Sequence, residues 1–187
     1  MDFDLIPIEQ AKRRLSSLRR PIIGIFDGGS VPHRIWPYDR VLRLIKRLNE
    51  KGYSVVVVGG RSELPLSQII KKELKLPNDR FLDLIGKTSL SETAAILSQL
   101  DLLISTDSSL LHLGYAVGIK TVALFGPGIP EKWAPRGHGH IVIRKNLPCS
   151  PCTKFGYMPP CPYGYRCMKE IKVDDVMAGV EKAMKGE

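Results

Sequence analysis

Short apolar runs, each followed by a turn of glycine or small polar residues, constrain the fold of this chain more than any other feature. Apolar runs without polar alternation are typical of strands that are buried on both faces of a parallel sheet. Helical patterns separate them, as in 38–50, where Val41, Leu44, Ile45 and Leu48 recur at helical spacing. The expected strands are 22–26, 53–58, 81–85, 102–104, 122–125 and 141–143. We therefore predict an α/β fold, a single Rossmann-like, doubly wound parallel sheet of about six strands with helices on both faces.

The 187 residues are enough for one domain with a substantial core, and 43% of them are hydrophobic, as in ordinary globular proteins. We expect residues 1–20 to form an N-terminal helix or linker, and 21–187 to form the domain. No apolar run approaches the roughly 18 residues of a membrane span. The first residues, Met1–Asp4, do not resemble the start of a signal peptide. These features predict a cytoplasmic protein.

The chain carries a formal net charge of +9, from 28 basic and 19 acidic residues. Its densest basic cluster comprises Lys12, Arg13, Arg14, Arg19 and Arg20. Such an excess either aids solubility or attracts an anionic small ligand, an anionic membrane surface or nucleic acid. Aromatic residues are only 7% and do not alternate with the basic ones, which argues against stacking on single-stranded nucleic acid. We therefore expect a small anionic partner and no nucleic acid, with peripheral contact to an anionic membrane as a further option.

The polar turns after the strands contain the candidate binding residues, because ligands of such sheets bind outside the carboxyl ends of the strands. The clearest turn is 105–112, where Asp107, Ser108 and Ser109 precede an apolar helical run as good N-cap residues. A helix start offers free N–H groups and partial positive charge, which together bind phosphate. His112 follows about one helical turn later on the same face. We expect Asp107 to cap this helix, whether or not its carboxylate also faces a sugar.

The first turn supplies further candidates. Gly28, Gly29 and Ser30 either bring backbone N–H groups close to an oxygen ligand or form a plain loop. Arg34 either pairs with a pyrophosphate or is a solvated arginine. Trp36 is expected to position this loop at the start of the next helix.

The second and third turns, which follow 53–58 and 81–85, have similar alternatives. Glu63 either accepts hydrogen bonds from ribose hydroxyls or favours the dipole of its own helix. Lys87, Thr88 and Leu90 either frame a base or serve as simple turn residues.

Five segments of this chain, 34–37, 58–63, 84–90, 107–112 and 122–127, resemble in order the motifs of heptosyltransferase-type glycosyltransferases. These enzymes move ADP-heptose onto the inner core of lipopolysaccharide. The resemblance covers roughly residues 21–180 and implies the C-terminal, donor-binding half of a two-domain GT-B fold. It also implies inverting, metal-independent transfer from a nucleotide-sugar, without a cofactor for catalysis.

The resemblance assigns roles to the candidate residues. It implies that Ser30 and Arg34 meet the diphosphate, that Glu63 meets the ribose, and that Thr88 and Leu90 lie near the adenine. The residues that would hold the phosphate and sugar are Asp107, Ser108, Ser109 and His112, of which His112, like Arg34, is a candidate catalytic residue. The family usually has lysine at the position of Arg34 and glycine at that of Ser109.

The family's N-terminal half, which carries the acceptor site for a glycan or lipid and the general base, has no counterpart in residues 1–20. We therefore expect this chain to bind donor but to turn over poorly alone. Two alternatives remain open: a non-enzymatic nucleotide-binding or regulatory module, and a zinc-stapled nucleic-acid binder.

All four cysteines, Cys149, Cys152, Cys161 and Cys167, lie in a proline-rich loop at 146–168. The first pair has the C-x2-C spacing of zinc sites, whereas the second pair is more widely spaced. A loop of this length without secondary structure needs a staple to be ordered. Structural zinc is the leading interpretation, and two disulfides or free thiols are the alternatives.

Overall fold

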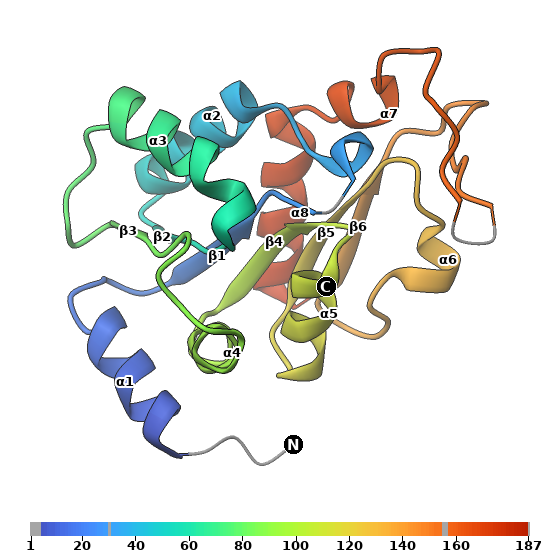
Figure 1. Cartoon of the computed structure of the whole chain (residues 1–187). Coiled ribbons are helices and arrows are strands. Elements are labelled where there is room, and N and C mark those ends of the chain that lie inside the picture. Colours follow the sequence, from blue (N-terminus) through green and yellow to red (C-terminus); the bar gives the residue numbers. More distant parts are fainter. Residues whose placement is uncertain (1–4, 30, 155–156, 187) are drawn as a thin grey trace.

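A computed structural model of the chain describes residues 5–29, 31–154 and 157–186. Its centre is a six-stranded, all-parallel sheet in the order β3-β2-β1-β4-β5-β6 (Figure 1). The strands are β1 (Ile22–Phe26), β2 (Ser54–Val57), β3 (Phe81–Asp83), β4 (Leu102–Thr106), β5 (Thr121–Phe125) and β6 (His140–Arg144). The predicted doubly wound α/β fold is confirmed.

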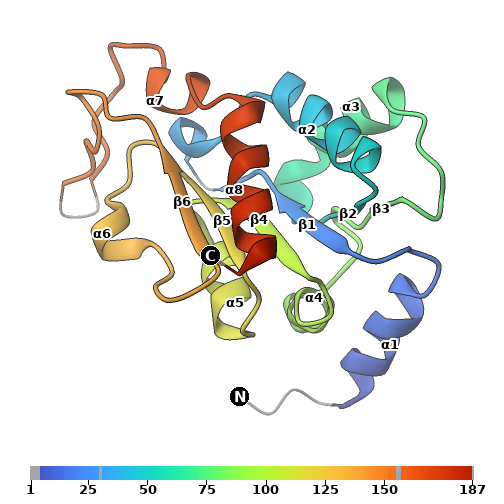
Figure 2. The ribbon, with the colours of Figure 1, turned by 180° about the vertical axis from the view of Figure 1, so that it is seen from behind.

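Helices cover both faces of the sheet. One face carries α2, α3 and α8, whereas α1, α4 and α5 lie on the other (Figures 1 and 2). The main helices are α1 (Leu5–Leu15), α2 (Tyr38–Glu50), α3 (Leu64–Glu73), α4 (Leu90–Leu97), α5 (Ser109–Ala116) and α8 (Val173–Lys185). Two four-residue helices, α6 (Pro130–Trp133) and α7 (Arg166–Lys169), and two 3-10 turns, η1 (Pro32–Arg34) and η2 (Arg61–Glu63), complete the described elements.

The core follows directly from the periodicity of the sequence. The four apolar residues predicted to face inward from α2, Val41, Leu44, Ile45 and Leu48, are completely buried. They pack against one face of the strands, together with the apolar side of α8. Each large side chain buried in this way stabilises the fold by roughly 1.5–3 kcal/mol. The helical spacing alone therefore identifies which face of α2 is buried.

The helix at the N-terminus packs into the hydrophobic cluster on the opposite face of the sheet from α2. Ala11 and Leu15 of α1 are buried in the same cluster as Ile96 and Leu97 of α4. Within the helix or linker expected over residues 1–20, α1 ends at Leu15.

Most of the predicted basic cluster is paired with acid. The pairs are Lys12 with Glu9 at 2.8 Å, Arg14 with Glu92 at 3.8 Å, Arg19 with Asp79 at 2.8 Å and Arg20 with Asp101 at 2.8 Å. Exposed pairs of this kind add little stability. Their consequence is electrostatic, because four of the five cations have a neutralising neighbour.

The order of the strands reverses between β1 and β4, which are direct neighbours. The loops that leave these two strands therefore diverge and open a crevice at the carboxyl edge of the sheet. The cysteine-rich segment comes to the same edge, where the backbone N–H groups of Cys152 and Thr153 both donate to the carbonyl of Pro127 at 3.1 Å. Within the described ranges, no helix is both long and apolar enough to span a membrane.

Candidate functional site

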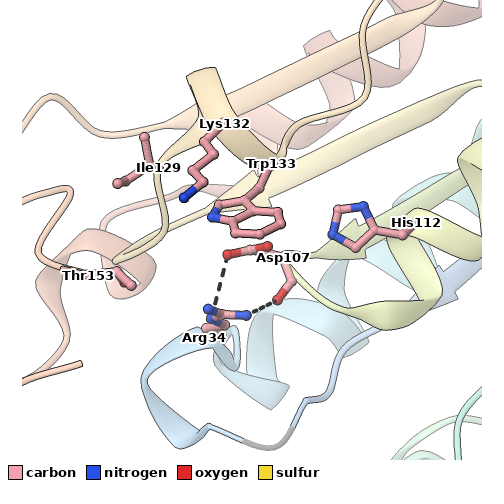
Figure 3. A pocket seen from close by; sticks show the side chains of 7 residues that line it. All are labelled: Arg34, Asp107, His112, Ile129, Lys132, Trp133 and Thr153. Carbon is pink, nitrogen blue, oxygen red and sulfur yellow. Dashed lines mark hydrogen bonds and ion pairs between the residues drawn. The ribbon is translucent and has the colours of Figure 1, made fainter. Parts of the chain in front are cut away.

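A cavity of about 290 Å³ lies at the carboxyl edge of the sheet (Figure 3). It is lined by Arg34, Asp107, His112, Ile129, Lys132, Trp133 and Thr153. These residues come from the loop after β1, the turn into α5, the α6 segment after β5 and the cysteine-rich segment. The cavity therefore collects side chains from four places that are far apart in the sequence.

Arg34 and Asp107 face each other across the switch point of the sheet. The Arg34 Nη1 donates to the Asp107 carbonyl at 3.2 Å, and Arg34 Nε lies 3.5 Å from Asp107 Oδ2. Neither Nε nor Oδ2 forms a hydrogen bond among the described residues, although both atoms are buried. Figure 3 shows the two side chains turned toward the cavity. The pair thus offers unused donor and acceptor capacity to a ligand.

The carboxylate of Asp107 does not cap α5, so our expectation of an Asp107 cap is wrong. Ser108 is the N-cap, and its hydroxyl accepts from the N–H of Leu111 at 3.4 Å. The backbone of Asp107 still belongs to the end of the sheet, since its N–H donates to the carbonyl of Leu124 at 3.2 Å. This pairing turns the side chain away from the helix start and toward Arg34.

The surroundings of Asp107 set its protonation. Burial raises the pKa of this carboxyl above its ordinary value, and the charges of Arg34 and His112 partly oppose that rise. A methyl group on Gly128 would lie 2.2 Å from Asp107 Oδ2, so the turn after β5 can approach the carboxylate only as glycine. The packing of this turn is therefore matched to the position of Asp107.

The far wall of the cavity was not predicted. Lys132 and Trp133 of α6 point toward the Arg34–Asp107 pair, and His112 approaches from α5 (Figure 3). The rings of His112 and Trp133 meet edge to face with centroids 6.3 Å apart, and Lys132 Nζ lies 5.1 Å from the Trp133 centroid. A signal was available, because α6 follows the carboxyl end of β5 in the same way as the turns that we selected.

The first turn is anchored by buried contacts. Trp36 is 1% exposed. Its backbone N–H donates to Asp27 Oδ1 at 2.8 Å, and its indole N–H donates to the carbonyl of Ile171 at 3.0 Å. Trp36 therefore positions the loop and does not stack on a ligand. Gly29 has a φ of 143°, which favours glycine. Ser30 lies outside the described residues.

Glu63 is buried behind this turn. Its Oε2 accepts from the N–H of Gly60 at 2.7 Å, and its Oε1 accepts from the hydroxyl of Ser62 at 2.8 Å. A methyl group on Gly28 would lie 2.5 Å from Glu63 Oε1, so the first and second turns are in close contact. The Glu63 carboxylate thus stabilises its own turn, and the same side chain packs against Gly28 of the first turn.

The third turn is separate from the cavity. Lys87 Nζ donates to the carbonyl of Asp83 at 2.5 Å, and the hydroxyls of Thr88 and Thr93 are 2.8 Å apart. Leu90 is 69% exposed, an unusual position for a large apolar side chain at the start of a helix. The structure thus brings Arg34, Asp107 and His112 together, but leaves Glu63, Lys87, Thr88 and Leu90 on neighbouring turns.

The four cysteines line one cavity of about 280 Å³ and are free thiols. Burial raises the pKa of Cys167 to about 11, with the neighbouring cysteines as smaller contributors in the same direction. Over the described ranges, no group of three or more histidine, cysteine or acidic side chains is arranged to hold a metal ion. The thiols are therefore neighbours without being a preformed coordination sphere.

An all-parallel sheet in this strand order, with a charged cavity at its switch point, defines a Rossmann-like ligand-binding domain. The model of one family, glycosyltransferase family 9 (heptosyltransferase), matches residues 6–158. The chain belongs to this family.

Named relatives agree with this assignment. The lipooligosaccharide heptosyltransferase 2 of Haemophilus influenzae is 31% identical over 127 residues, which cover 67% of this chain and 37% of that protein. The lipopolysaccharide heptosyltransferase 2 of Escherichia coli K12 is 30% identical over 130 residues, which cover 68% of this chain and 37% of that protein. The chain therefore matches little more than a third of these relatives.

Solved structures show the same fold. A glycosyltransferase family 9 protein from Veillonella parvula superimposes with a TM-score of 0.82 and 25% identity, over 100% of this chain and 54% of that chain. The ADP-heptose heptosyltransferase II of E. coli gives a TM-score of 0.79 and 24% identity, over 99% of this chain and 53% of that one. This chain thus spans about half the length of each structure.

Proposed function

We propose that this chain is the donor-binding half of a glycosyltransferase that transfers a heptose-like sugar from ADP to the core of lipopolysaccharide. One observation carries the proposal: Arg34, Asp107 and the start of α5 converge in a cavity at the switch point of the sheet. The named relatives, which are heptosyltransferases, supply the substrate class.

The diphosphate would bind between Arg34 and the first turn of α5. Arg34 supplies a fixed cation, and the N–H groups of Ser109 and its successor have no carbonyl partner within the helix. The same positive groups would stabilise the diphosphate as it departs. Asp107, an acceptor beside this cation, suits the hydroxyl groups of the sugar, and His112 can reach the same ligand from the next turn of α5.

The nucleoside would extend over the second and third turns. Glu63 retains lone pairs that can accept from ribose hydroxyls, since each of its oxygens accepts one hydrogen bond. The exposed side chains of Leu64 and Leu90 provide apolar surface for a base, with Lys87 and Thr88 beside them. This path joins the cavity to the end of β3.

The reaction proposed is an inverting transfer that needs no metal. The acceptor glycan or lipid and the general base would come from a second domain, so the isolated chain would bind donor without appreciable turnover. The transfer would take place in the cytoplasm, at or near the inner membrane, and the protein would have no nucleic acid as a partner.

The cysteine-rich segment has a structural role in this proposal. Thr153 lines the cavity, and its hydroxyl donates to the Pro127 carbonyl at 2.8 Å. Zinc bound by Cys149, Cys152, Cys161 and Cys167 would brace this wall. Zinc binding requires the four sulfurs to draw together, because each must approach the metal to about 2.3 Å.

Calorimetric titration with ADP, UDP and GDP tests the donor proposal. We expect ADP to bind most tightly, and Arg34→Ala or His112→Ala to weaken it about 10- to 100-fold, the usual cost of a lost charged or buried polar contact. Arg43→Ala is the matched control, because Arg43 lies on α2 and is paired with Asp39, away from the cavity.

Unchanged ADP affinity in both variants would contradict the site. Transfer of sugar to an acceptor by the purified chain would contradict the claim that a second half is needed.

A further inference from the structure

The turn that follows β3, residues 84–89, is held by a side chain from a distant part of the sequence. Arg14 of α1 reaches this turn, and its Nη1 donates to the carbonyl of Lys87 at 3.1 Å. The Nη2 of the same guanidinium lies 3.8 Å from Glu92 Oε1 on α4. One arginine thus connects the N-terminal helix to the turn over which the base of the donor is proposed to lie.

Apolar packing brings Arg14 to this place. Ala11 and Leu15 are buried in one cluster with the apolar side of α4, so the two helices lie side by side (Figures 1 and 2). Arg14 follows Ala11 by three residues and directly precedes Leu15, so its side chain leaves α1 beside this buried stripe. The backbone of α1 is therefore fixed independently of the polar contacts that Arg14 makes.

The two arms of the Arg14 guanidinium bracket Thr88. One arm holds the carbonyl of Lys87, the residue before it. The other faces Glu92, whose Oε2 accepts from the N–H of Ser89, the residue after it, at 2.7 Å. The hydrogen bonds from Ser89 hold the pKa of Glu92 below its ordinary value, and the charge of Arg14 adds to this effect. Both neighbours of Thr88 are thus fixed by one network.

Thr88 itself keeps two backbone groups available. Its hydroxyl lies 2.8 Å from that of Thr93, which fixes the side chain. Over the described part of the chain, neither the N–H nor the C=O of Thr88 forms a hydrogen bond. Leu90, which is 69% exposed, follows two residues later. The turn therefore offers one fixed donor and one fixed acceptor close to an apolar side chain.

A fixed donor and a fixed acceptor can distinguish one base from another. On its Watson–Crick edge, adenine carries an amino donor next to a ring-nitrogen acceptor, whereas guanine and uracil carry a carbonyl acceptor next to an N–H donor. A base that is tethered through its ribose cannot turn freely to exchange these positions. The wrong base would leave the peptide groups unpaired, and that cost makes such a site selective.

We propose that Arg14 is a positioning residue for base selection: it fixes the N–H and C=O of Thr88 where they pair with adenine and reject guanine and uracil. The inference rests on the proposed function, which lays the nucleoside over this turn. It extends the donor site to α1, whose described residues do not line the donor cavity.

Calorimetric titration of the full chain with ADP, GDP and pyrophosphate tests the role of Arg14. Pyrophosphate carries no base, so it reports on the Arg34 end of the site alone. We expect Arg14→Gln to weaken ADP binding about tenfold, the cost of a lost charge-assisted contact, and to narrow the preference for ADP over GDP by a similar factor. Pyrophosphate affinity should stay within about twofold, which would also show that the variant is folded.

Arg13→Gln is the matched control. Arg13 is the neighbouring exposed arginine on α1, and it forms no ion pair among the described residues. The substitution removes the same charge from the same helix, so it accounts for any long-range electrostatic effect on an anionic ligand. Its affinities for all three ligands should match those of the unaltered chain within about twofold.

An unchanged preference for ADP over GDP in Arg14→Gln, an equal loss of ADP and pyrophosphate binding, or equal effects of the two arginine variants would each overturn the role of Arg14. Equal affinity of the unaltered chain for ADP and GDP would overturn base selection by Thr88. If the unaltered chain binds neither nucleotide, the proposed function itself fails, so the two failures are distinguishable.

Discussion

Replacing Asp27 by asparagine is expected to remove a pH dependence of stability that this one carboxyl imposes. Asp27 follows β1 and is 3% exposed. Its Oδ1 accepts from the N–H of Trp36, whereas its Oδ2 has no partner among the described residues. Burial raises the pKa of Asp27 from 3.8 to about 7, the Trp36 hydrogen bond opposes that rise, and the charge of Glu63 adds to it.

The sign follows from the two states. Between about pH 4 and pH 7 the folded chain keeps a proton on Asp27 that the unfolded chain releases, so the free energy of unfolding falls as pH rises through this window. At 1.36 kcal/mol per pKa unit, the full loss is about 4 kcal/mol by pH 8. Asparagine preserves the oxygen that accepts from Trp36 and carries no charge.

Urea unfolding of both proteins at several pH values between about 5 and 8 measures the effect. The Asp27→Asn variant should become progressively more stable than the unaltered chain as pH rises, with the gap largest at the alkaline end. Asp39→Asn, at an exposed position on α2, is the control and should track the unaltered chain. A constant difference between the Asp27→Asn variant and the unaltered chain across this range would refute the reasoning.

Three further predictions test the site and its support. Gly128→Ala should displace the Asp107 carboxylate, because the new methyl group would lie 2.2 Å from Oδ2, and with it the Arg34 side chain that faces this carboxylate at 3.5 Å. Since Arg34 is assigned to the diphosphate, ADP binding in calorimetry should weaken by about tenfold or more. Ser108→Ala should lower the free energy of unfolding by about 1 kcal/mol in urea titrations through loss of the α5 cap, and no loss would contradict that cap. Elemental analysis should find one zinc per chain; a chelator, or Cys152→Ser, should lower the melting temperature, and metal-free protein of unchanged stability would exclude the zinc site.

The arrangement of strands and helices was readable from the sequence because it depends on local patterns. The apolar run Ile22–Phe26 and the helical spacing of α2 match the structure at both ends. Most errors lie at element ends, as at α3, where a 3-10 turn over Arg61–Glu63 precedes the helix. The short helices α6 and α7 were not predicted, and the end of the 146–168 loop, expected to be without secondary structure, forms α7. An apolar run without polar alternation is buried on both faces, so it has few positions other than a central strand of the sheet. The local pattern therefore predicts where it lies.

The candidate site was only partly readable in the same way. Arg34, Asp107 and His112 follow strand ends, and strand ends of a parallel sheet share one edge, so their meeting could be expected. The role of Asp107 in local structure could not be predicted from the sequence. A short acidic residue in a turn before a helix can either cap that helix or pair with an arginine, and the local sequence is the same in both cases. Ser108 forms the cap, and this leaves the carboxylate to Arg34.

By itself, the sequence determined the layered α/β architecture and the edge at which its polar turns gather, since both arise from periodicities within a few residues. Only the tertiary structure decided which side chains share a cavity. Lys132 and Trp133 reach it because the turn after β5 passes close to Asp107, and Thr153 reaches it through the Pro127 carbonyl. Contacts between segments distant in the chain depend on how loops pack against each other, and no local pattern encodes that packing.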